Sequence, residues 1–262
     1  MEIVKFQPVP GSDGQVTGYL HTPIWEMETR RESFPAVIIC PGGAYFLCSQ
    51  RESDPVALRF LAAGYHAAVL RYSVEDGARD YRPLSELSES LALLRARAEE
   101  WGIRPHQIAV CGFSAGGHLA LSSAVLDLPG RPADQQRPDA LILSYPVVTA
   151  GPYAHRGSFV RLSGTGDLEA HRAFGLEDKI TPAVPPVFVW HTMEDATVPV
   201  ENTLMLVSAL HRSGVPCEAH LFPRGKHGLS VCTAEVGNEM PHPGRWFELA
   251  AEWLGEQFGY HV

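Results

Sequence analysis

Short apolar runs alternate with segments of helical periodicity along most of the chain. The apolar runs, many of them β-branched, predict strands over 36–40, 66–72, 107–113, 139–145, 186–192 and 218–222. Apolar residues at helical spacing predict helices over 54–64, 84–101, 114–126, 200–212 and 246–258. Because continuously apolar strands are buried on both faces, this alternation predicts an α/β fold with a mostly parallel central sheet and helices on both faces.

Two regions depart from the alternation. Residues 1–30 hold apolar positions such as Val16 and Leu20 between turn residues, which predicts an antiparallel hairpin at a sheet edge and about eight strands in all. Residues 147–184 are weakly patterned and predict either a small cap or a long loop. Neither an internal repeat nor a linker is evident, so we expect one domain over 1–262.

Composition narrows the classes of function. The 262 residues hold 21 Lys plus Arg against 30 Asp plus Glu, a formal charge of −9, which argues against nucleic-acid and anionic membrane partners. No run of 18 apolar residues suggests a membrane span, and the first ten residues do not resemble a secretion signal. Five cysteines without a C-x-x-C pair fit reduced thiols, so we expect a cytoplasmic protein. A homodimer stays open.

The first chemical motif is a serine between two glycines. The segment 112–116, Gly-Phe-Ser-Ala-Gly, matches G-x-S-x-G between a predicted strand and a predicted helix. Glycines there let strand and helix approach, and the helix N-terminus offers N–H groups to an oxyanion. Ser114 is therefore the predicted nucleophile; the alternative is a plain glycine-rich turn with Ser114 as the helix N-cap. His118 lies on the same helix, and we expect it to pack or support rather than act as the base.

A glycine pair follows the strand over 36–40. The segment 41–45, Pro-Gly-Gly-Ala-Tyr, permits a backbone whose N–H groups face inward, although it differs at two positions from the H-G-G-G pattern of esterases. On that alignment the N–H groups of Gly43, Ala44 and Ala115 form an oxyanion hole. The alternative is a tight turn without a catalytic part. Tyr45 is a candidate for the pocket lining.

The acid and the base follow later strands. Asp195 lies in the loop after the strand over 186–192 and is the predicted acid. Its neighbour Glu194 is the alternative candidate for the acid. The non-catalytic alternative is that Asp195 only caps a turn or helix. His227 lies between Gly225 and Gly228 in the loop after the last strand, which makes it the predicted base. The other four histidines beyond Asp195 lie in a helix, in a strand, between prolines or near the end of the chain: His211, His220, His242 and His261.

These three residues have the roles of a serine-hydrolase triad. His227 would remove the proton of Ser114 during attack on an ester carbonyl and later protonate the leaving alcohol. Asp195 would hold the tautomer of His227 and stabilise its cation.

The motifs together resemble the α/β-hydrolase superfamily. The likeness is greatest to bacterial esterase and lipase-like proteins related to acetyl xylan esterases and to the BD-FAE type of feruloyl and acetyl xylan esterase. It is carried by residues 41–45, 64–65, 69–73, 112–119, 185–188, 191–192, 195, 198–202 and 225–229. The resemblance implies removal of acetyl, or sometimes feruloyl, groups from plant-polysaccharide fragments.

Other functions remain as alternatives. Within this fold they are a general short-chain carboxylesterase and a small serine peptidase; outside enzymes, a non-catalytic binding module. Dienelactone hydrolases use a cysteine nucleophile, so Ser114 argues against them. Glycosidases need two opposed carboxylates, which the predicted triad does not supply, so glycosidase action is disfavoured. No His/Cys spacing suits zinc, so we expect neither metal nor cofactor. The expected partner is a small-molecule or oligosaccharide acyl ester.

Overall fold

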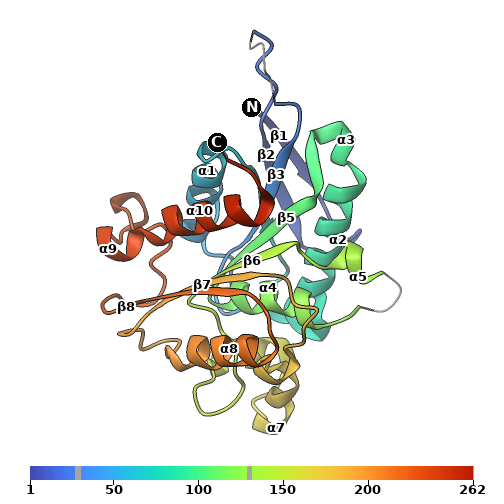
Figure 1. The fold of residues 1–262 in the computed structure, drawn as a ribbon. Coiled ribbons are helices and arrows are strands. Elements are labelled where there is room, and N and C mark those ends of the chain that lie inside the picture. The colour runs from blue at the N-terminus through green and yellow to red at the C-terminus, as the bar shows by residue number, and fades with distance from the viewer. Residues whose placement is uncertain (27–30, 129–131, 262) are drawn as a thin grey trace.

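An eight-stranded sheet forms the centre of the molecule. The computed structural model describes residues 1–26, 31–128 and 132–261. The strand order is β1-β2-β4-β3-β5-β6-β7-β8; β2 is antiparallel to its neighbours β1 and β4, and every pair from β4 to β8 is parallel (Figure 1). The strands are β1 (Glu2–Phe6), β2 (Gln15–Leu20), β3 (Phe34–Cys40), β4 (His66–Arg71), β5 (Ile103–Phe113), β6 (Ala140–Ser144), β7 (Val187–Thr192) and β8 (Cys217–Phe222).

The predicted fold class is confirmed. Each apolar run forms a parallel strand, and the hairpin expected in residues 1–30 is the pair β1 and β2 at one edge of the sheet. Residues 27–30 of that prediction lie outside the described residues. Strands β3 and β6 and the C-terminal half of β5 are buried at every position, because helices cover both faces there.

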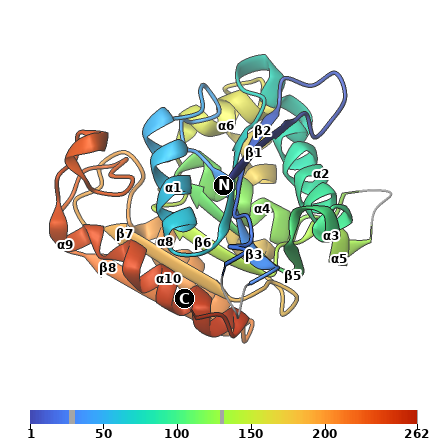
Figure 2. The ribbon, with the colours of Figure 1, turned by 90° about the horizontal axis from the view of Figure 1, so that it is seen from above.

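Helices cover the sheet in two layers. The first layer, α1 and α10, lies on one face of the sheet (Figure 2). It packs there through side chains such as Phe60 and Trp246. The second, α2, α4 and α8, packs on the other through Leu91, Leu119 and Leu206. The helices are α1 (Asp54–Ala62), α2 (Arg82–Ala96), α3 (Ala98–Trp101), α4 (Ala115–Val125), α5 (Ala133–Gln136), α6 (Arg156–Ser163), α7 (Leu168–His171), α8 (Glu201–Arg212), α9 (Pro241–Gly244) and α10 (Trp246–Phe258).

One predicted helix is divided in the structure. Residues 84–101 were expected to be continuous, but α2 ends at Ala96 and α3 begins at Ala98. Arg97 between them has φ −100° and ψ 17°, outside helical geometry. The apolar spacing continues across this break, which is why periodicity alone does not reveal it.

Short helices fill the weakly patterned segment 147–184. It contains α6, α7 and the 3-10 turns η3 (Arg172–Phe174) and η4 (Glu177–Lys179), which lie beyond the carboxyl end of β6. Phe159 of α6 is fully buried and its ring contacts that of His118 on α4. The segment therefore packs onto the sheet domain through α4. The boundaries of a single domain stay a prediction.

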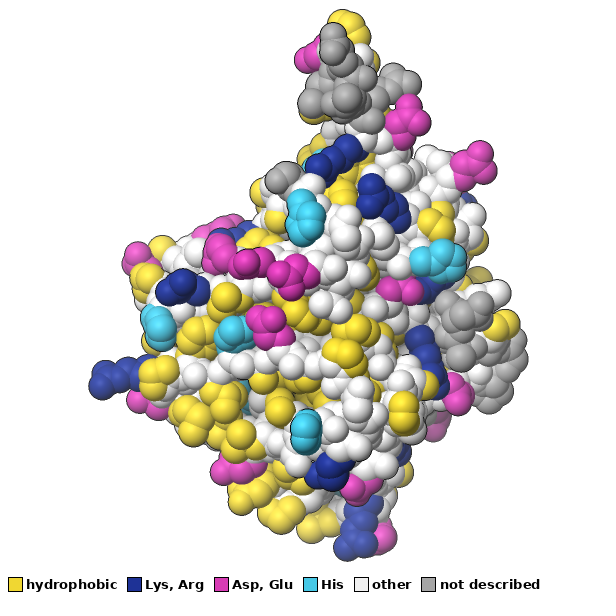
Figure 3. Space-filling model, in the orientation of Figure 1, with side chains coloured by type: hydrophobic (Ala, Val, Ile, Leu, Met, Phe, Trp, Pro, Cys, Tyr) yellow, Lys and Arg dark blue, Asp and Glu magenta, His cyan; other side chains and the backbone are white. Residues whose placement is uncertain are grey.

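The surface carries mixed charge. On the face seen in Figure 3, acidic and basic side chains are interspersed, so the net charge of −9 forms no single-sign field there. Within the described ranges, we find no helix with both the length and the apolar character that crossing a bilayer requires.

His118 joins three parts of the chain. Its Nε2 lies 2.8 Å from the Phe174 carbonyl oxygen, and its Nδ1 lies 2.9 Å from the Tyr45 hydroxyl. Because the carbonyl can only accept, Nε2 carries the hydrogen and Nδ1 accepts from Tyr45. Burial lowers the pKa of His118 to about 4, so the ring is neutral at neutral pH. It supports the loop over 41–45 from within the core, as its position on α4 suggested.

We expect His118 to make the fold sensitive to acid. Between pH 6.5 and about 4 the unfolded chain binds a proton at this ring that the folded chain does not, so stability falls as the pH falls. The ring contributes a slope of up to about 1.4 kcal/mol per pH unit. His118→Gln, which keeps a donor and an acceptor, should flatten the fall in the free energy of unfolding, measured by urea titration at several pH values.

The control is His106→Gln, at an exposed position on β5, which should retain the wild-type slope. Wild-type and His118→Gln curves that run parallel between pH 6.5 and 4 would contradict this account of His118.

Candidate active site

The turn between β5 and α4 holds Ser114 in a rare conformation. Its φ is 51° and its ψ −116°, a region that residues other than glycine seldom adopt. Two glycines make the turn fit. A Cβ on Gly116 would lie 2.1 Å from the Cys40 carbonyl oxygen, and one on Gly112 would lie 2.3 Å from the Gly116 carbonyl oxygen. Any side chain at either position would push α4 away from the end of β3 and move Ser114 with it.

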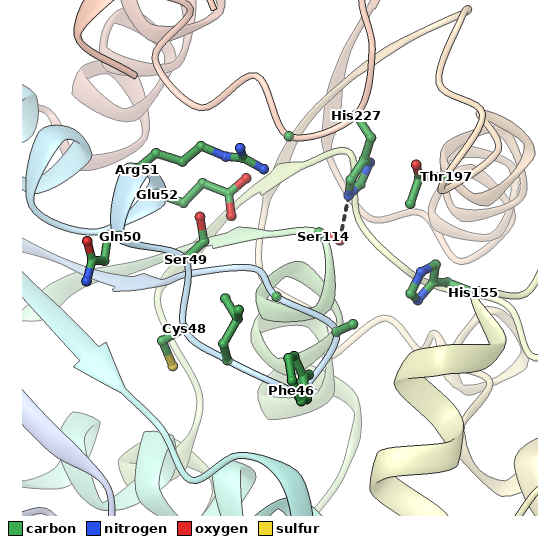
Figure 4. A pocket seen from close by; sticks show the side chains of 14 residues that line it. Phe46, Cys48, Ser49, Gln50, Arg51, Glu52, Ser114, His155, Thr197 and His227 are labelled. Carbon is green, nitrogen blue, oxygen red and sulfur yellow. Dashed lines mark hydrogen bonds between the residues drawn. The ribbon is translucent and has the colours of Figure 1, made fainter. Parts of the chain in front are cut away.

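Hydrogen bonds join Ser114, His227 and Asp195 in a row. Ser114 Oγ lies 2.8 Å from His227 Nε2 (Figure 4). On the other side of the ring, His227 Nδ1 lies 2.6 Å from Asp195 Oδ2. Because the Asp195 carboxylate can only accept a hydrogen bond, Nδ1 of His227 carries the hydrogen. Nε2 of His227 is then free to accept the proton of Ser114. The structure thus brings together the three residues predicted as nucleophile, base and acid.

Asp195 is buried with four donors around its carboxylate. Oδ1 accepts from the N–H groups of Thr197 and Val198, each at 2.9 Å, and Oδ2 accepts from His191 as well as from His227. Burial raises the pKa of Asp195, but the hydrogen bonds from both histidines and the charge of His227 outweigh it and hold the pKa well below its usual range. The carboxylate therefore stays ionised beside His227 across the neutral range.

His191 is a part of this arrangement that sequence reasoning missed. Its ring is buried at the end of β7, with Nε2 3.2 Å from Asp195 Oδ2 and 2.9 Å from the Val198 carbonyl oxygen. Nδ1 lies 2.8 Å from the Thr203 hydroxyl. Because Nε2 faces two acceptors it donates, and Nδ1 accepts from Thr203. The available signals were its position four residues before Asp195 and its place among the residues that carry the family resemblance.

The loop that carries His227 is fixed at its first glycine. Thr192 Oγ1 donates to the Gly225 carbonyl oxygen at 2.8 Å, and Glu194 Oε2 accepts from the Gly225 N–H at 3.1 Å. Glu194, the local alternative to Asp195, thus bonds to the backbone of the loop, whereas Asp195 bonds to the histidine ring. These two bonds place His227 over the turn at Ser114.

A buried carboxylate connects the other end of this loop to the glycine pair. Glu52 Oε2 accepts from the Gly42 N–H at 3.0 Å, and Oε1 accepts from the Tyr145 hydroxyl at 2.7 Å. Tyr145 Oη in turn accepts from the Ser230 N–H at 2.9 Å, and its ring lies edge-on to His227, with centroids 5.0 Å apart. Nothing in the sequence around Glu52 indicated this role, because its two partners lie 10 and 93 residues away along the chain.

Two residues of the glycine-pair loop, Gly43 and Ala44, line the pocket beside Ser114. Gly43 has φ 127° and Ala44 has φ 57°, and the N–H groups of residues 46 and 47 close the turn on the Gly43 carbonyl oxygen. Within the described chain, no acceptor is bonded to the N–H groups of Gly43, Ala44 or Ala115. Gly43, Ala44 and Ala115 thus carry free donors around the turn that holds Ser114.

Tyr45 was predicted to line the pocket, but its side chain lies in the core. Its ring is buried, with 1% exposed, and its hydroxyl bonds to His118 in the core. The reason is the positive φ of 57° at both Ala44 and Tyr45, which turns the chain and directs this side chain inward. Phe46 and Leu47 line the pocket instead.

A pocket of about 720 Å³ opens over Ser114 and His227 (Figure 4). Its described lining combines apolar side chains with polar ones; the latter are Ser49, Gln50, Arg51, Glu52, His155 and Thr197. His155 Nδ1 accepts from the Ser158 N–H at 3.3 Å and caps α6. Burial lowers the pKa of His155, so it faces the pocket as a neutral ring. In the described ranges, no three His, Cys, Asp or Glu side chains form a group that could hold a metal ion.

Two family models match different parts of the chain. The BD-FAE model matches residues 23–131, and the model of the prolyl oligopeptidase family matches residues 152–259. Among curated proteins, endo-1,4-beta-xylanase B from Butyrivibrio fibrisolvens is 35% identical over 209 residues, which are 76% of this chain. The match spans only 33% of the length of that protein.

Solved structures match over nearly the full length. The acetyl ester-xyloside bifunctional hydrolase from Caldicellulosiruptor lactoaceticus is 32% identical with a TM-score of 0.81, over 98% of this chain and 92% of that one. MGS-M1, an alpha/beta hydrolase enzyme from a Medee basin deep-sea metagenome library, is 35% identical with a TM-score of 0.82, over 99% and 98%. The predicted superfamily is confirmed: this chain belongs to the α/β hydrolases.

Proposed function

We propose that the protein is a serine esterase that removes acetyl groups from oligosaccharides derived from plant polysaccharides. The observation that carries the proposal is the row of hydrogen bonds from Ser114 through His227 to Asp195, next to three free N–H groups. A nucleophile, an oriented base and donors for an oxyanion are the parts that acyl transfer requires.

The reaction follows from the positions of these groups. His227 Nε2 takes the proton of Ser114 as Oγ attacks the ester carbonyl carbon, and the buried carboxylate of Asp195 stabilises the imidazolium that forms. The imidazolium then gives its proton to the alcohol oxygen, which leaves an acyl-enzyme. Water activated by the same ring releases the acid and frees Ser114.

The free N–H groups have a part in the same step. The carbonyl oxygen gains negative charge during the attack, and donors already in place stabilise that charge without reorganisation. We assign this role to the N–H groups of Gly43, Ala44 and Ala115. The N-terminus of α4 adds positive potential at the same point.

The choice of an acetylated sugar rests on the pocket and on the relatives. A volume of about 720 Å³ accommodates a small acyl ester of a sugar, and the polar lining offers hydrogen bonds to hydroxyl groups. The similar structure from Caldicellulosiruptor lactoaceticus is named as an acetyl ester-xyloside bifunctional hydrolase. The pocket lining has Glu52 as its one carboxylate among the described residues, and its two oxygens are already bonded, which leaves no opposed pair for glycosidase chemistry.

A peptidase is the second candidate. The match of the prolyl oligopeptidase model to residues 152–259 favours it, since that range contains both Asp195 and His227. A general short-chain carboxylesterase and a non-catalytic binding module remain as alternatives.

The cellular setting is also part of the proposal. All five cysteines are free thiols in the structure, and burial raises the pKa of Cys40 and of Cys111. Thiols of this kind fit a reducing compartment, so we propose a cytoplasmic location. A homodimer stays a prediction.

Substitutions in the row of hydrogen bonds should lower kcat by large factors. We expect Ser114→Ala to reduce the rate of 4-nitrophenyl acetate hydrolysis by at least about 10³-fold and Asp195→Asn by about 10⁴-fold, because the asparagine favours the wrong tautomer of His227. Glu194→Gln keeps the side chain in place beside Gly225 and should cost at most about tenfold. Unchanged hydrolysis by Ser114→Ala, or a larger loss at Glu194 than at Asp195, would contradict the assignment.

The substrate class is tested by a comparison of esters and an amide. We expect a higher kcat/KM for acetylated xylo-oligosaccharides than for 4-nitrophenyl acetate, and little cleavage of a prolyl 4-nitroanilide. The purified enzyme, assayed by released acetate and by absorbance, gives all three values. Rates no better on the carbohydrate would overturn the sugar assignment, and efficient cleavage of the anilide would favour the peptidase.

A further inference from the structure

The guanidinium of Arg51 lies next to the proposed base. Arg51 belongs to the 3-10 turn η1 (Gln50–Glu52), and its side chain extends across the pocket toward His227 (Figure 4). A Cβ built on Gly228 would lie 2.6 Å from Arg51 Nη2, so the guanidinium rests on the backbone of the residue that follows His227.

The backbone at Arg51 is fixed from two sides. The Arg51 carbonyl oxygen accepts a short hydrogen bond from the hydroxyl of Ser230, in the loop that also carries His227. The next residue, Glu52, is 2% exposed and is bonded to Gly42 and Tyr145. The side chain of Arg51 therefore starts from a rigid point at the pocket wall.

The charge of Arg51 has no partner in the part of the chain that the structure describes. Other arginines pair with carboxylates within 4 Å, among them Arg59, Arg71, Arg95 and Arg137. Glu52, the adjacent carboxylate, points its oxygens at the Gly42 N–H and the Tyr145 hydroxyl, and no ion pair joins it to Arg51. His155, on the opposite wall, is neutral. Arg51 thus supplies an unpaired positive charge to a pocket in a protein of net charge −9.

We infer that Arg51 binds a carboxylate on the alcohol part of the ester, which rests on the esterase function proposed above. A guanidinium presents paired donors that match a carboxylate. The side of the substrate follows from the reaction: His227 protonates the alcohol oxygen, so the alcohol leaves on the His227 side, where Arg51 lies. The substrate class is therefore an acyl ester of an acidic alcohol, such as an oligosaccharide that contains a uronic acid.

The test compares two esters that differ in charge. Both 4-acetoxybenzoate and 4-acetoxybenzamide carry the acetyl group on a phenol, but only the first has a carboxylate on the leaving side. We expect Arg51→Gln to lower kcat/KM for 4-acetoxybenzoate about fivefold, the upper range for an exposed ion pair. The kcat/KM for 4-acetoxybenzamide should change less than about twofold. Arg51→Lys should retain part of the preference.

The matched control is Arg224→Gln. Arg224 is exposed in the loop between β8 and His227 and does not line the pocket, so this variant removes a nearby charge and should leave the ratio of the two substrates unchanged. Equal fold losses for both esters in Arg51→Gln would overturn the inference. A loss confined to mono-4-nitrophenyl glutarate, whose carboxylate lies on the acyl part, would also overturn it.

A binding measurement separates this inference from the proposed function. Calorimetry with the Ser114→Ala protein needs no turnover; we expect 4-acetoxybenzoate to bind more tightly than the amide, and Arg51→Gln in that background to remove the difference. If the wild-type enzyme hydrolyses neither ester but this difference is present, the esterase proposal fails and the carboxylate site stands. Equal affinities for the two compounds would overturn the carboxylate site.

Discussion

The close contact between the start of α4 and the end of β3 is the constraint on which the site depends. Gly116 lies against the Cys40 carbonyl oxygen with no space for a side chain. Because α4 begins there, Ser114 takes its left-handed φ of 51°, and the first N–H groups of α4 are left without carbonyl partners. The same contact brings the loop after β3, with Gly43 and Ala44, to the helix N-terminus. One steric requirement thus places the nucleophile and the proposed oxyanion donors together.

Around this fixed point the other groups are held by buried polar contacts. Asp195 is ionised in the interior because four donors surround it, and two of them come from histidines. Glu52 joins the glycine-pair loop to Tyr145 and, through it, to the loop that carries His227. Loss of one of these hydrogen bonds would leave a buried carboxylate unsatisfied and would lower the free energy of unfolding. The position of each loop therefore restricts the positions of the others. Rigidity of this kind holds the serine, the base and the donors at the distances and orientations that the reaction requires.

Much of this architecture could be predicted from the sequence, and the reason is physical. Strands buried on both faces must be continuously apolar, so β3 and β6 stand out in the pattern. Ser114, between glycines at a strand-to-helix turn, is equally visible. His191, Tyr145 and Glu52 were not, because their roles arise only where loops from the carboxyl ends of several strands meet.

The errors have local causes. Tyr45 was expected in the pocket, but a positive φ at Ala44 and at Tyr45 reverses the chain, and no residue type announces that turn. The break at Arg97 lies inside an uninterrupted apolar period. In both cases a backbone angle decided the outcome, whereas the side-chain pattern was unchanged.

The most direct test of the account is a crystal structure of the enzyme inhibited by a 4-nitrophenyl phosphonate, which mimics the tetrahedral intermediate. The account predicts a covalent bond from Ser114 Oγ to phosphorus and a phosphoryl oxygen about 2.7–3.2 Å from the backbone nitrogens of Gly43, Ala44 and Ala115. His227 Nε2 should face the oxygen that replaces the leaving group. An adduct on another residue, or a phosphoryl oxygen directed away from these nitrogens, would contradict it.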